Sequence, residues 1–365
     1  MQLNRLKWET TTEYNTGLDA SFLKGKLRFT VDVYQKYIKD LLQKKVKMPT
    51  SIGYGNGYEV SYMNSGKMTN KGWEFRVDAV PFENRDWRVG FYFNIAHNEN
   101  KITEMPDNYT EENYTFNNGE YAYRREEGRP MGSFYGYRYK GVCQNKDATY
   151  ARDADGNVMK DISGNAIVMR NGTATIAPGD ALYEDINHDG VINQYDIVYL
   201  GNSNPRFTGG AGVNVSYKQF KLSAIFYGRY GQDVVNSTRL NNESMRGIDN
   251  QSTAVLRRWR NEGDQTDIPR ALYGEGYNTL GSDRFVEDAS YLRLKSLSFN
   301  YRLPKKIIQR WGFSNIDVYV TGYNLFTWTK YTGQDPEVKT ENTYARDSAT
   351  TPASIQLVAG FNLSF

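Results

Sequence analysis

The sequence predicts an all-β protein that forms a transmembrane antiparallel β-barrel, and three features lead to this prediction. Apolar and polar residues alternate strictly in several segments, short turns alternate with long polar connections, and aromatic residues are abundant. No apolar run approaches the roughly 18 to 20 residues that a membrane-spanning helix needs, and the mean hydropathy is −0.70. A helical membrane protein is therefore excluded, whereas a barrel built from two-faced strands is favoured.

The alternation is clearest at the end of the chain, in residues 354–365. Side chains of a strand point alternately to opposite sides, so residues two apart share a face. The other face of this strand is polar apart from Val358, and in a transmembrane barrel the two faces would meet lipid and lumen. The apolar face carries Ile355, Leu357, Ala359, Phe361, Leu363 and Phe365.

The same pattern recurs in pairs of segments that are joined by tight turns. Residues 7–22 and 27–37 each alternate, and the turn Leu23-Lys24-Gly25-Lys26 separates them. Residues 73–78 and 87–95 form a second pair around Asn84-Arg85-Asp86. Alternating runs that flank a short polar turn predict β-hairpins.

The connections between alternating segments are of two kinds. A tight turn at Lys218-Gln219 joins two of them, whereas long polar excursions cover residues 103–129 and 145–204. Short turns at one end of the strands and long loops at the other end are typical of outer-membrane barrels. We therefore interpret residues 145–204 as a long external loop.

The composition agrees with this fold and excludes several functions. The 29 Tyr, 17 Phe and 6 Trp suit the two membrane interfaces, where large rings are favoured. With 45 basic and 42 acidic residues the net charge is only +3, so we expect no nucleic-acid partner. Arg257-Arg258 is interpreted as a small solvated cluster, and the single Cys143 cannot form an internal disulfide.

Signatures of catalysis are not found in the sequence. It has no Gly-x-Ser-x-Gly element, no phosphate-binding Gly-rich loop followed by Lys-Ser/Thr, and only 2 His residues. We therefore expect no catalytic residues and predict that the protein is not an enzyme.

The sharpest chemical motif lies at residues 185–196, within the predicted external loop. Its spacing matches an EF-hand-type calcium loop, which has oxygen ligands at positions 1, 3 and 5, Gly at position 6, a backbone carbonyl at position 7 and a carboxylate at position 12. The candidate Ca²⁺ ligands are Asp185, Asn187, Asp189, Val191 through its carbonyl, Asn193 and Asp196.

This calcium motif departs from the usual pattern at its last position. Asp196 stands where Glu is usual, and its shorter side chain closes the site less easily. Asp, Asn and Gly also build turns without any metal, so a purely structural turn is the alternative. With Ca²⁺ bound, the motif would hold the long external loop in one conformation.

A second loop, within residues 103–129, is rich in aromatic and Asn residues. Rings on such a loop could stack on a sugar or grip a peptide, which makes them candidate substrate contacts. Packing of this loop on itself or on another protein is the alternative. The candidates are Tyr109, Tyr114, Phe116, Tyr121 and Tyr123.

Four stretches of the sequence together resemble one known family. They are Asn64–Glu74, Pro178–Phe207 with its Asp-rich motif, Tyr291–Lys295 and Thr321–Phe326. The stretches occur in family order, and the match covers essentially all 365 residues. The chain thus resembles the SusC/RagA family of TonB-linked outer-membrane proteins of Bacteroidetes, the TonB-dependent transporters.

The resemblance implies a barrel of about 22 strands with a folded plug in its lumen. Residues 1–365 would be the C-terminal half of this barrel, with the calcium-type loop at residues 185–196 on its outside. Such proteins import oligosaccharides or peptides across the bacterial outer membrane. They are powered by TonB, and a SusD-like surface lipoprotein acts as the lid. We find no plug and no TonB box in this sequence, so we expect these parts to lie outside it.

The resemblance also implies a role for the last strand. Phe361, Leu363 and Phe365 would form the signal that the barrel-assembly machinery reads, and the apolar faces would contact membrane lipid. Two other classes of protein stay open on the residues alone. One is an extracellular calcium-binding β-sandwich adhesin or glycan-binding module, and the other is an outer-membrane porin or enzyme barrel without a plug.

Overall fold

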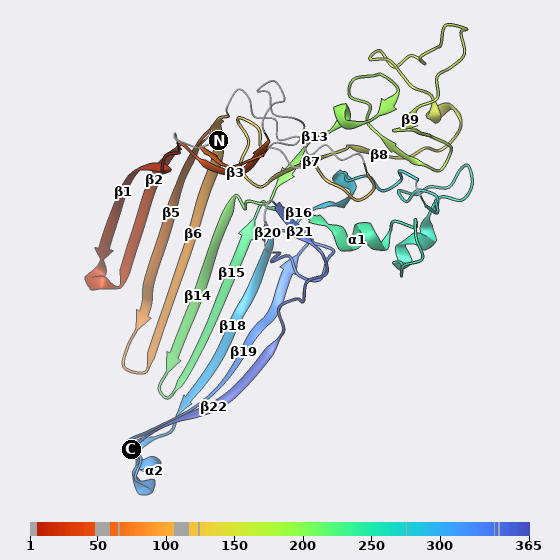
Figure 1. Cartoon of the computed structure of the whole chain (residues 1–365). Coiled ribbons are helices and arrows are strands. Elements are labelled where there is room, and N and C mark those ends of the chain that lie inside the picture. Colours follow the sequence, from red (N-terminus) through yellow and green to blue (C-terminus); the bar gives the residue numbers. More distant parts are fainter. Residues whose placement is uncertain are drawn as a thin grey trace.

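Long antiparallel strands form the wall of the molecule. The computed structural model describes residues 6–47, 59–64, 66–105, 117–122, 125–274, 276–338, 340–341 and 344–365. Within these residues, nine strands form one curved sheet in the order β1-β2-β5-β6-β14-β15-β18-β19-β22 (Figure 1). They are β1 (Thr10–Phe22), β2 (Leu27–Lys39), β5 (Lys67–Glu83), β6 (Trp87–Glu104), β14 (Phe207–Tyr217), β15 (Phe220–Tyr230), β18 (Tyr291–Arg302), β19 (Asn315–Thr329) and β22 (Gln356–Ser364).

Tight turns join neighbouring strands at one end of this sheet, as the sequence predicted. The turn between β1 and β2 is the short 3-10 segment η1 (Leu23–Gly25), in which Lys24 has φ 57° and Gly25 has φ 85°. Lys218-Gln219 joins β14 to β15, and Asn84 accepts the backbone N–H of Trp87 in the turn between β5 and β6. One turn is longer and holds α2 (Lys305–Ile308) and η7 (Gln309–Trp311).

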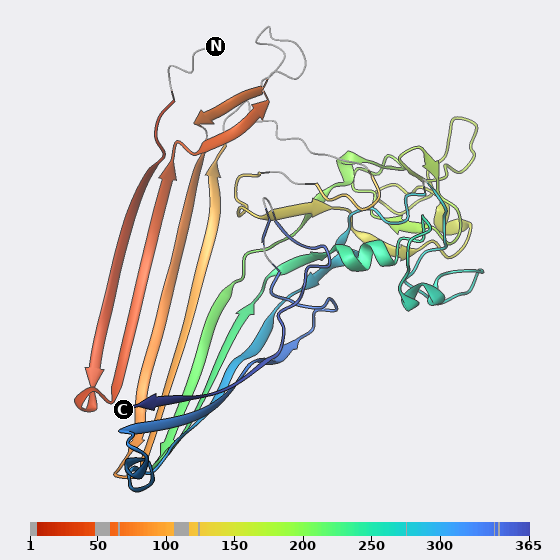
Figure 2. The same cartoon turned by 60° about the horizontal axis from the view of Figure 1, so that its bottom comes forward.

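The long connections gather at the opposite end of the sheet (Figures 1 and 2). No helix in the described part of the chain has the length and apolar character that crossing a membrane by a helix requires. The connections contain β3 (Leu42–Lys47), β4 (Glu59–Asn64), β7 (Ser133–Gly136), β8 (Tyr139–Val142), η3 (Asp147–Thr149), β9 (Arg170–Asn171), β10 (Ala174–Thr175), β11 (Ala181–Tyr183), β12 (Val191–Ile192), η4 (Gln194–Asp196), β13 (Val198–Asn202), β16 (Asp233–Asn236), α1 (Ser237–Asn242), η5 (Thr253–Arg257), η6 (Asp283–Phe285), β17 (Val286–Asp288), β20 (Thr340–Glu341) and β21 (Tyr344–Asp347).

The two long excursions expected at residues 103–129 and 145–204 belong to one connection. Strand β6 pairs directly with β14, with Phe91 opposite Val213, so no strand of the wall lies between them. The intervening β7 and β8 pair instead with β13 and β11, inside the connection itself. These short strands pair with partners about 40 to 65 residues away along the chain, and they are therefore not part of the wall.

One face of the sheet is apolar across all its strands. The register aligns rows of side chains that cross from strand to strand, and large members such as Leu222, Phe299 and Val320 are 43%, 45% and 49% exposed. No second sheet covers this face among the described residues, which argues against a β-sandwich. An apolar surface of this extent needs hydrocarbon against it. One such row is Val89, Val215, Leu222, Phe299, Val320 and Ala359.

Aromatic side chains mark both borders of the apolar face. At the turn end, the rings of Trp87 and Tyr217 lie 4.3 Å apart. At the loop end, Phe207 lies 5.3 Å from His97 and 6.2 Å from Trp73 between ring centroids. At ~3.3 Å per residue, β6 rises about 33 Å from Trp87 to His97. A tilt of ~40° reduces this height to about 25 Å, which is the height of the apolar band of an outer-membrane barrel.

The buried core of the protein lies in the long connections rather than in the sheet. Its largest cluster includes Tyr135, Tyr137, Ile192 and Leu280, all at most 1% exposed. Smaller clusters form around Phe134 and other residues of the same region. The connections therefore fold into a packed body of their own at the loop end of the wall.

We expect Val213→Arg to lower the free energy of unfolding by about 2–4 kcal/mol, because the arginine would enter hydrocarbon near mid-depth. Val213 is 39% exposed on the apolar face. Its neighbour Asn214 faces the lumen, so Asn214→Arg places the same side chain at the same depth. This control should cost about 1 kcal/mol, the value of the hydrogen bond from Ser223. Denaturant unfolding of the protein in lipid vesicles measures both, and equal losses would contradict the face assignment.

Candidate functional site

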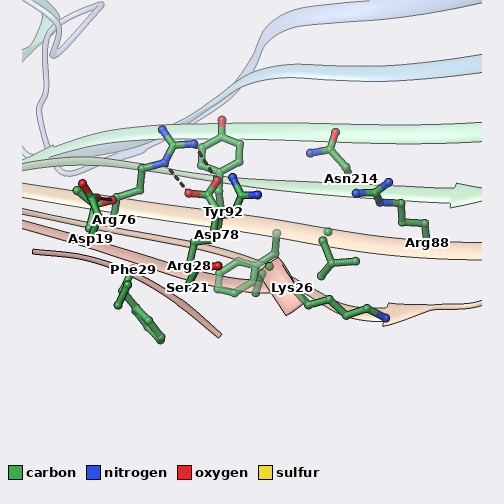
Figure 3. A pocket seen from close by; sticks show the side chains of 17 residues that line it. Asp19, Ser21, Lys26, Arg28, Phe29, Arg76, Asp78, Arg88, Tyr92 and Asn214 are labelled. Atoms are coloured by element: carbon green, nitrogen blue, oxygen red, sulfur yellow. Dashed lines mark hydrogen bonds and ion pairs between the residues drawn. The ribbon is translucent and has the colours of Figure 1, made fainter. Parts of the chain in front are cut away.

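The concave face of the wall is polar. Along each strand the polar residues alternate with the apolar ones, so they point to this side. Arg76 donates to both carboxylate oxygens of Asp78, at 2.7 and 2.8 Å, and its guanidinium lies 5.6 Å from the Tyr92 ring centroid. The space beside these residues has a volume of about 940 Å³ (Figure 3). Phe29, one strand away, points to the opposite side. This face can form ionic and hydrogen-bonded contacts with whatever fills the lumen.

A second pocket, which we call the mouth pocket, lies among the long connections. Its volume is about 580 Å³. Three separate parts of the chain line it, namely residues 236–257, residues 332–334 and residues 347–349. No aromatic side chain is among its described lining residues. These are Asn236, Thr238, Arg239, Asn242, Glu243, Ser252, Arg257, Thr332, Gly333, Gln334, Asp347 and Ala349.

Local capping and pairing build the mouth pocket. Asn236 caps α1 by accepting the N–H of Arg239 at 2.9 Å, and Ser252 caps η5 by accepting the N–H of Ala254 at 3.2 Å. Strand β16 pairs in parallel with β21, with Asn236 opposite Asp347. Together these contacts bring α1, η5 and the end of β21 to one place.

Two of the four charged residues that line the mouth pocket, Arg239 and Glu243, are ion-paired, and the Asp347 carboxylate accepts the Tyr331 hydroxyl at 2.6 Å. Arg239 donates to Glu243 at 3.0 Å and to Glu287 at 3.2 Å, and the buried Arg284 donates to Glu243 at 2.8 Å. Arg257 is different, because it is exposed and no carboxylate of the described residues lies within ion-pair distance of it. Its guanidinium is available to a ligand that enters the pocket.

A buried ionic cluster attaches the connection between β19 and β22 to the wall. Arg293 on β18 is 2% exposed and donates to Asp335 and, at 2.8 Å, to Glu337. Lys295 also donates to Glu337, at 2.9 Å. Burial acts to raise the pKa of Asp335, but the N–H groups of Ala353 and Glu337 and the Arg293 guanidinium together hold it below its ordinary value.

The predicted calcium loop is held by hydrogen bonds to its own backbone. The Asp185 carboxylate accepts the N–H groups of Asp189 at 3.3 Å and Gly190 at 2.8 Å, and Gly190 has φ 80°. The buried Asp196 accepts the N–H groups of Ile186 and Asn193, both at 2.8 Å. The sharp turn expected at Gly190 is therefore present, and Asp196 closes the loop from its far end.

The donors of this loop fit Ca²⁺ by their kind and order. Asp185, Asp189 and Asp196 supply carboxylates, Val191 supplies its carbonyl, and Asn187 supplies an amide oxygen. The Asn193 amide donates to the Val191 carbonyl at 3.0 Å. Among the residues that the structure describes, however, no three Asp, Glu, His or Cys side chains lie close enough together to hold a metal ion. Calcium binding at this loop stays a prediction.

The other predicted site residues fall in two groups. Tyr109, Tyr114, Phe116 and Tyr123 lie outside the described residues, so their role as substrate contacts stays a prediction. Tyr121 is 6% exposed and donates to the Ser282 carbonyl at 2.7 Å, which places its ring in the loop core.

The residues of the predicted assembly signal lie at the end of the apolar face. Leu363 is paired opposite Ile316, and Phe361 opposite Val318. The ring of Phe365 packs against Phe313 at 5.0 Å between centroids. This placement exposes Phe361 and Phe365 on the lipid side, at 67% and 89%, while their reading by the assembly machinery stays a prediction.

Comparisons with known proteins agree with this architecture. The family described as TonB dependent receptor-like, beta-barrel matches residues 2–325. TonB-dependent receptor P3 of Formosa agariphila is 32% identical over 349 residues, which cover 93% of this chain and 32% of that protein. TonB-dependent receptor SusC of Bacteroides thetaiotaomicron is 27% identical, over 99% of this chain and 32% of its own length.

A similar solved structure is that of the RagAB peptide transporter. It superposes with a TM-score of 0.70 and 27% sequence identity, over 98% of this chain and 36% of that chain. The chain therefore spans about a third of the length of the relatives that it matches.

We expect Arg293→Met to destabilise the connection between β19 and β22 by about 3–5 kcal/mol, because Asp335 would lose its cation in a buried place. Arg302→Met is the matched control. Arg302 pairs with Asp317, but its side chain is 63% exposed, so the loss should be at most about 1 kcal/mol. Protease cleavage within residues 330–353 measures the difference. Equal cleavage in both variants would show that the buried ionic cluster does not hold this connection.

The pH dependence of this buried ionic cluster follows from the lowered pKa of Asp335. Its stabilising contribution is fully present above the ordinary carboxyl pKa of ~3.9 and is lost as the pH falls through the lower folded-state value. The natural protein should therefore resist cleavage in this connection until the pH falls below about 4.

Proposed function

Because the chain belongs to the TonB dependent receptor-like, beta-barrel family, we propose that it forms wall and loops of an importer in the bacterial outer membrane. The observation that carries this proposal is the two-faced sheet. Its apolar side meets lipid, its charged concave side faces a lumen, and a folded body of loops stands at the mouth. Such a wall encloses a polar path across a membrane.

We further propose that the imported nutrient is a peptide rather than an oligosaccharide. The mouth pocket offers amides, hydroxyls, the ion-paired Arg239 and Glu243, the Asp347 carboxylate and the Arg257 guanidinium, and it has no aromatic ring among its described lining residues. Sugar rings are commonly held by stacking on aromatic side chains, whereas amides and a guanidinium suit a peptide backbone and a carboxylate. The similar RagAB structure is that of a peptide transporter.

The proposed partners follow from the family. A SusD-like surface lipoprotein would cover the mouth, TonB would act through a segment outside these residues, and the barrel-assembly machinery would insert the strands through the C-terminal one. The family is one of receptors and transporters, and we assign no catalytic role to the chain.

We also propose that the loop at residues 185–196 binds Ca²⁺. The twelve-position spacing and the left-handed Gly190 support this. The ion would neutralise three carboxylates at one loop and stiffen the connection around it.

Calcium removal provides the test of that loop. We expect chelation to increase protease cleavage near residues 185–196, because the carboxylates would repel one another without the ion. Asp189→Asn should give the same increase without a chelator. Cleavage that is indifferent to added Ca²⁺ and to chelation would show that the motif is only a turn.

A charge-removing variant of the mouth pocket tests the substrate class. We expect Arg257→Gln to weaken binding of an acidic peptide by about 10- to 100-fold, since a charge-assisted hydrogen bond contributes ~1.5–3 kcal/mol. Arg258→Gln is the control, because Arg258 lies outside the pocket and donates to the Val255 carbonyl. Calorimetry with the protein in detergent measures both. Binding of oligosaccharides alone, or equal weakening by both variants, would argue against the peptide proposal.

A further inference from the structure

The turn between β18 and β19 differs in size and charge from the other turns at that end of the described sheet. It contains α2 and η7, and between Leu303 and Ile316 the sequence has no Asp or Glu. Lys305, Lys306 and Arg310 are all exposed. Three cations are therefore presented at the edge of the wall without an acidic residue in the same turn.

The same turn exposes large apolar side chains. Ile307 is 46% exposed and Trp311 is 60% exposed. Both belong to the short helical segment formed by α2 and η7. Ile308, in contrast, is 1% exposed and holds the helix against the strands. An exposed tryptophan beside an exposed isoleucine is unfavourable in water and favourable at a membrane interface.

The position of the turn continues the apolar face of the wall. Phe313 packs on Phe365 at 5.0 Å between ring centroids, and Ile316 is paired opposite Leu363 on the lipid side. Both α2 and the end of the chain lie at the turn end of the sheet (Figure 2). In outer-membrane barrels the short turns face the periplasm. The exposed apolar surface therefore extends the lipid-facing belt at its periplasmic border.

We propose that the turn at residues 303–314 is an interfacial anchor that binds anionic phospholipid headgroups of the periplasmic leaflet. Lys305, Lys306 and Arg310 contact the headgroup phosphates, while Ile307 and Trp311 insert at the boundary between headgroups and acyl chains. The charge of the turn and its continuity with the lipid-facing belt select this occupant. The inference depends on the membrane location of the strands and is independent of what is imported.

Lipid selectivity provides the test. The purified protein is reconstituted in nanodiscs of phosphatidylcholine, and association of spin-labelled phosphatidylglycerol is compared with that of spin-labelled phosphatidylcholine. Each basic residue at an anionic surface contributes up to about fivefold in affinity. The measured preference is smaller than the product of three such contributions, because it averages over all the lipids around the wall. We expect the natural protein to prefer phosphatidylglycerol severalfold at low salt, and the variant Lys305→Gln/Lys306→Gln/Arg310→Gln to lose most of this preference.

A matched control removes the same charge from other turns at that end. The variant Lys24→Gln/Arg85→Gln/Lys218→Gln should keep the preference. Equal loss in both variants would mean that the whole rim attracts anions, and the proposal would fail. An unchanged preference in the first variant would overturn it as well, because the lipid selectivity would then arise elsewhere on the wall.

The depth of Trp311 gives a second, charge-independent measurement. Trp311→Phe removes one of the 6 tryptophans, so the difference between the two emission spectra isolates this residue. We expect the difference emission to be quenched strongly by phospholipids brominated close to the headgroup. Quenching by an aqueous quencher instead of by the brominated lipids would show that Trp311 lies in water, contrary to the proposal.

Discussion

The hydrogen-bonded ladder between neighbouring strands is the constraint on which the rest of the molecule depends. Hydrocarbon offers no partner to a peptide group, so each strand must satisfy its N–H and C=O groups on its neighbours. Strands β5 and β6, of 17 and 18 residues, pair along almost their full length. Side chains are then free to divide between the two faces, and the division between lipid and lumen follows from the period of two.

This division explains why the core of the protein is not in its sheet. A wall with lipid on one side and a polar lumen on the other has no dry protein interior of its own. The long connections therefore carry the buried clusters, and they must be attached to the wall by other means. Arg293, buried on β18 and bonded to Asp335 and Glu337, supplies such an attachment for the connection that precedes β22.

The wall could be predicted from the sequence because its signal is local and repeated. Strict alternation in residues 354–365 or 87–95 directly reports which side chains meet hydrocarbon, and the tight turn at Lys218-Gln219 sets the register of its hairpin. The short strands of the loops carry no such signal. β7 has four residues, and its partner β13 lies more than 60 positions away, so only tertiary packing identifies the pair.

The site was harder to predict for the same reason. Tyr121 was a substrate candidate because an aromatic residue in a polar loop has the same sequence pattern whether it is exposed or buried. The mouth pocket joins residues 236–257 with residues 332–334 and 347–349, and no pattern in the sequence links these segments. Arg257 and Arg258 are neighbours of identical chemistry. They differ in their surroundings, because Arg257 ends η5 and lines the pocket, whereas the Arg258 guanidinium donates to the Val255 carbonyl.

The two ends of the wall differ in the structures that they can form, because their connections differ in length. Turns of two to four residues are too short to form a core, and the longer turn with α2 and η7 buries Ile308 but leaves Ile307 and Trp311 exposed. Connections of 25 to 100 residues can fold, bury charge and shape a pocket. The mouth pocket, where we propose that the ligand is recognised, accordingly lies at the loop end. The aromatic borders at the two ends of the strands fix the depth of the wall in the bilayer, and this depth sets the position of the loops above the membrane.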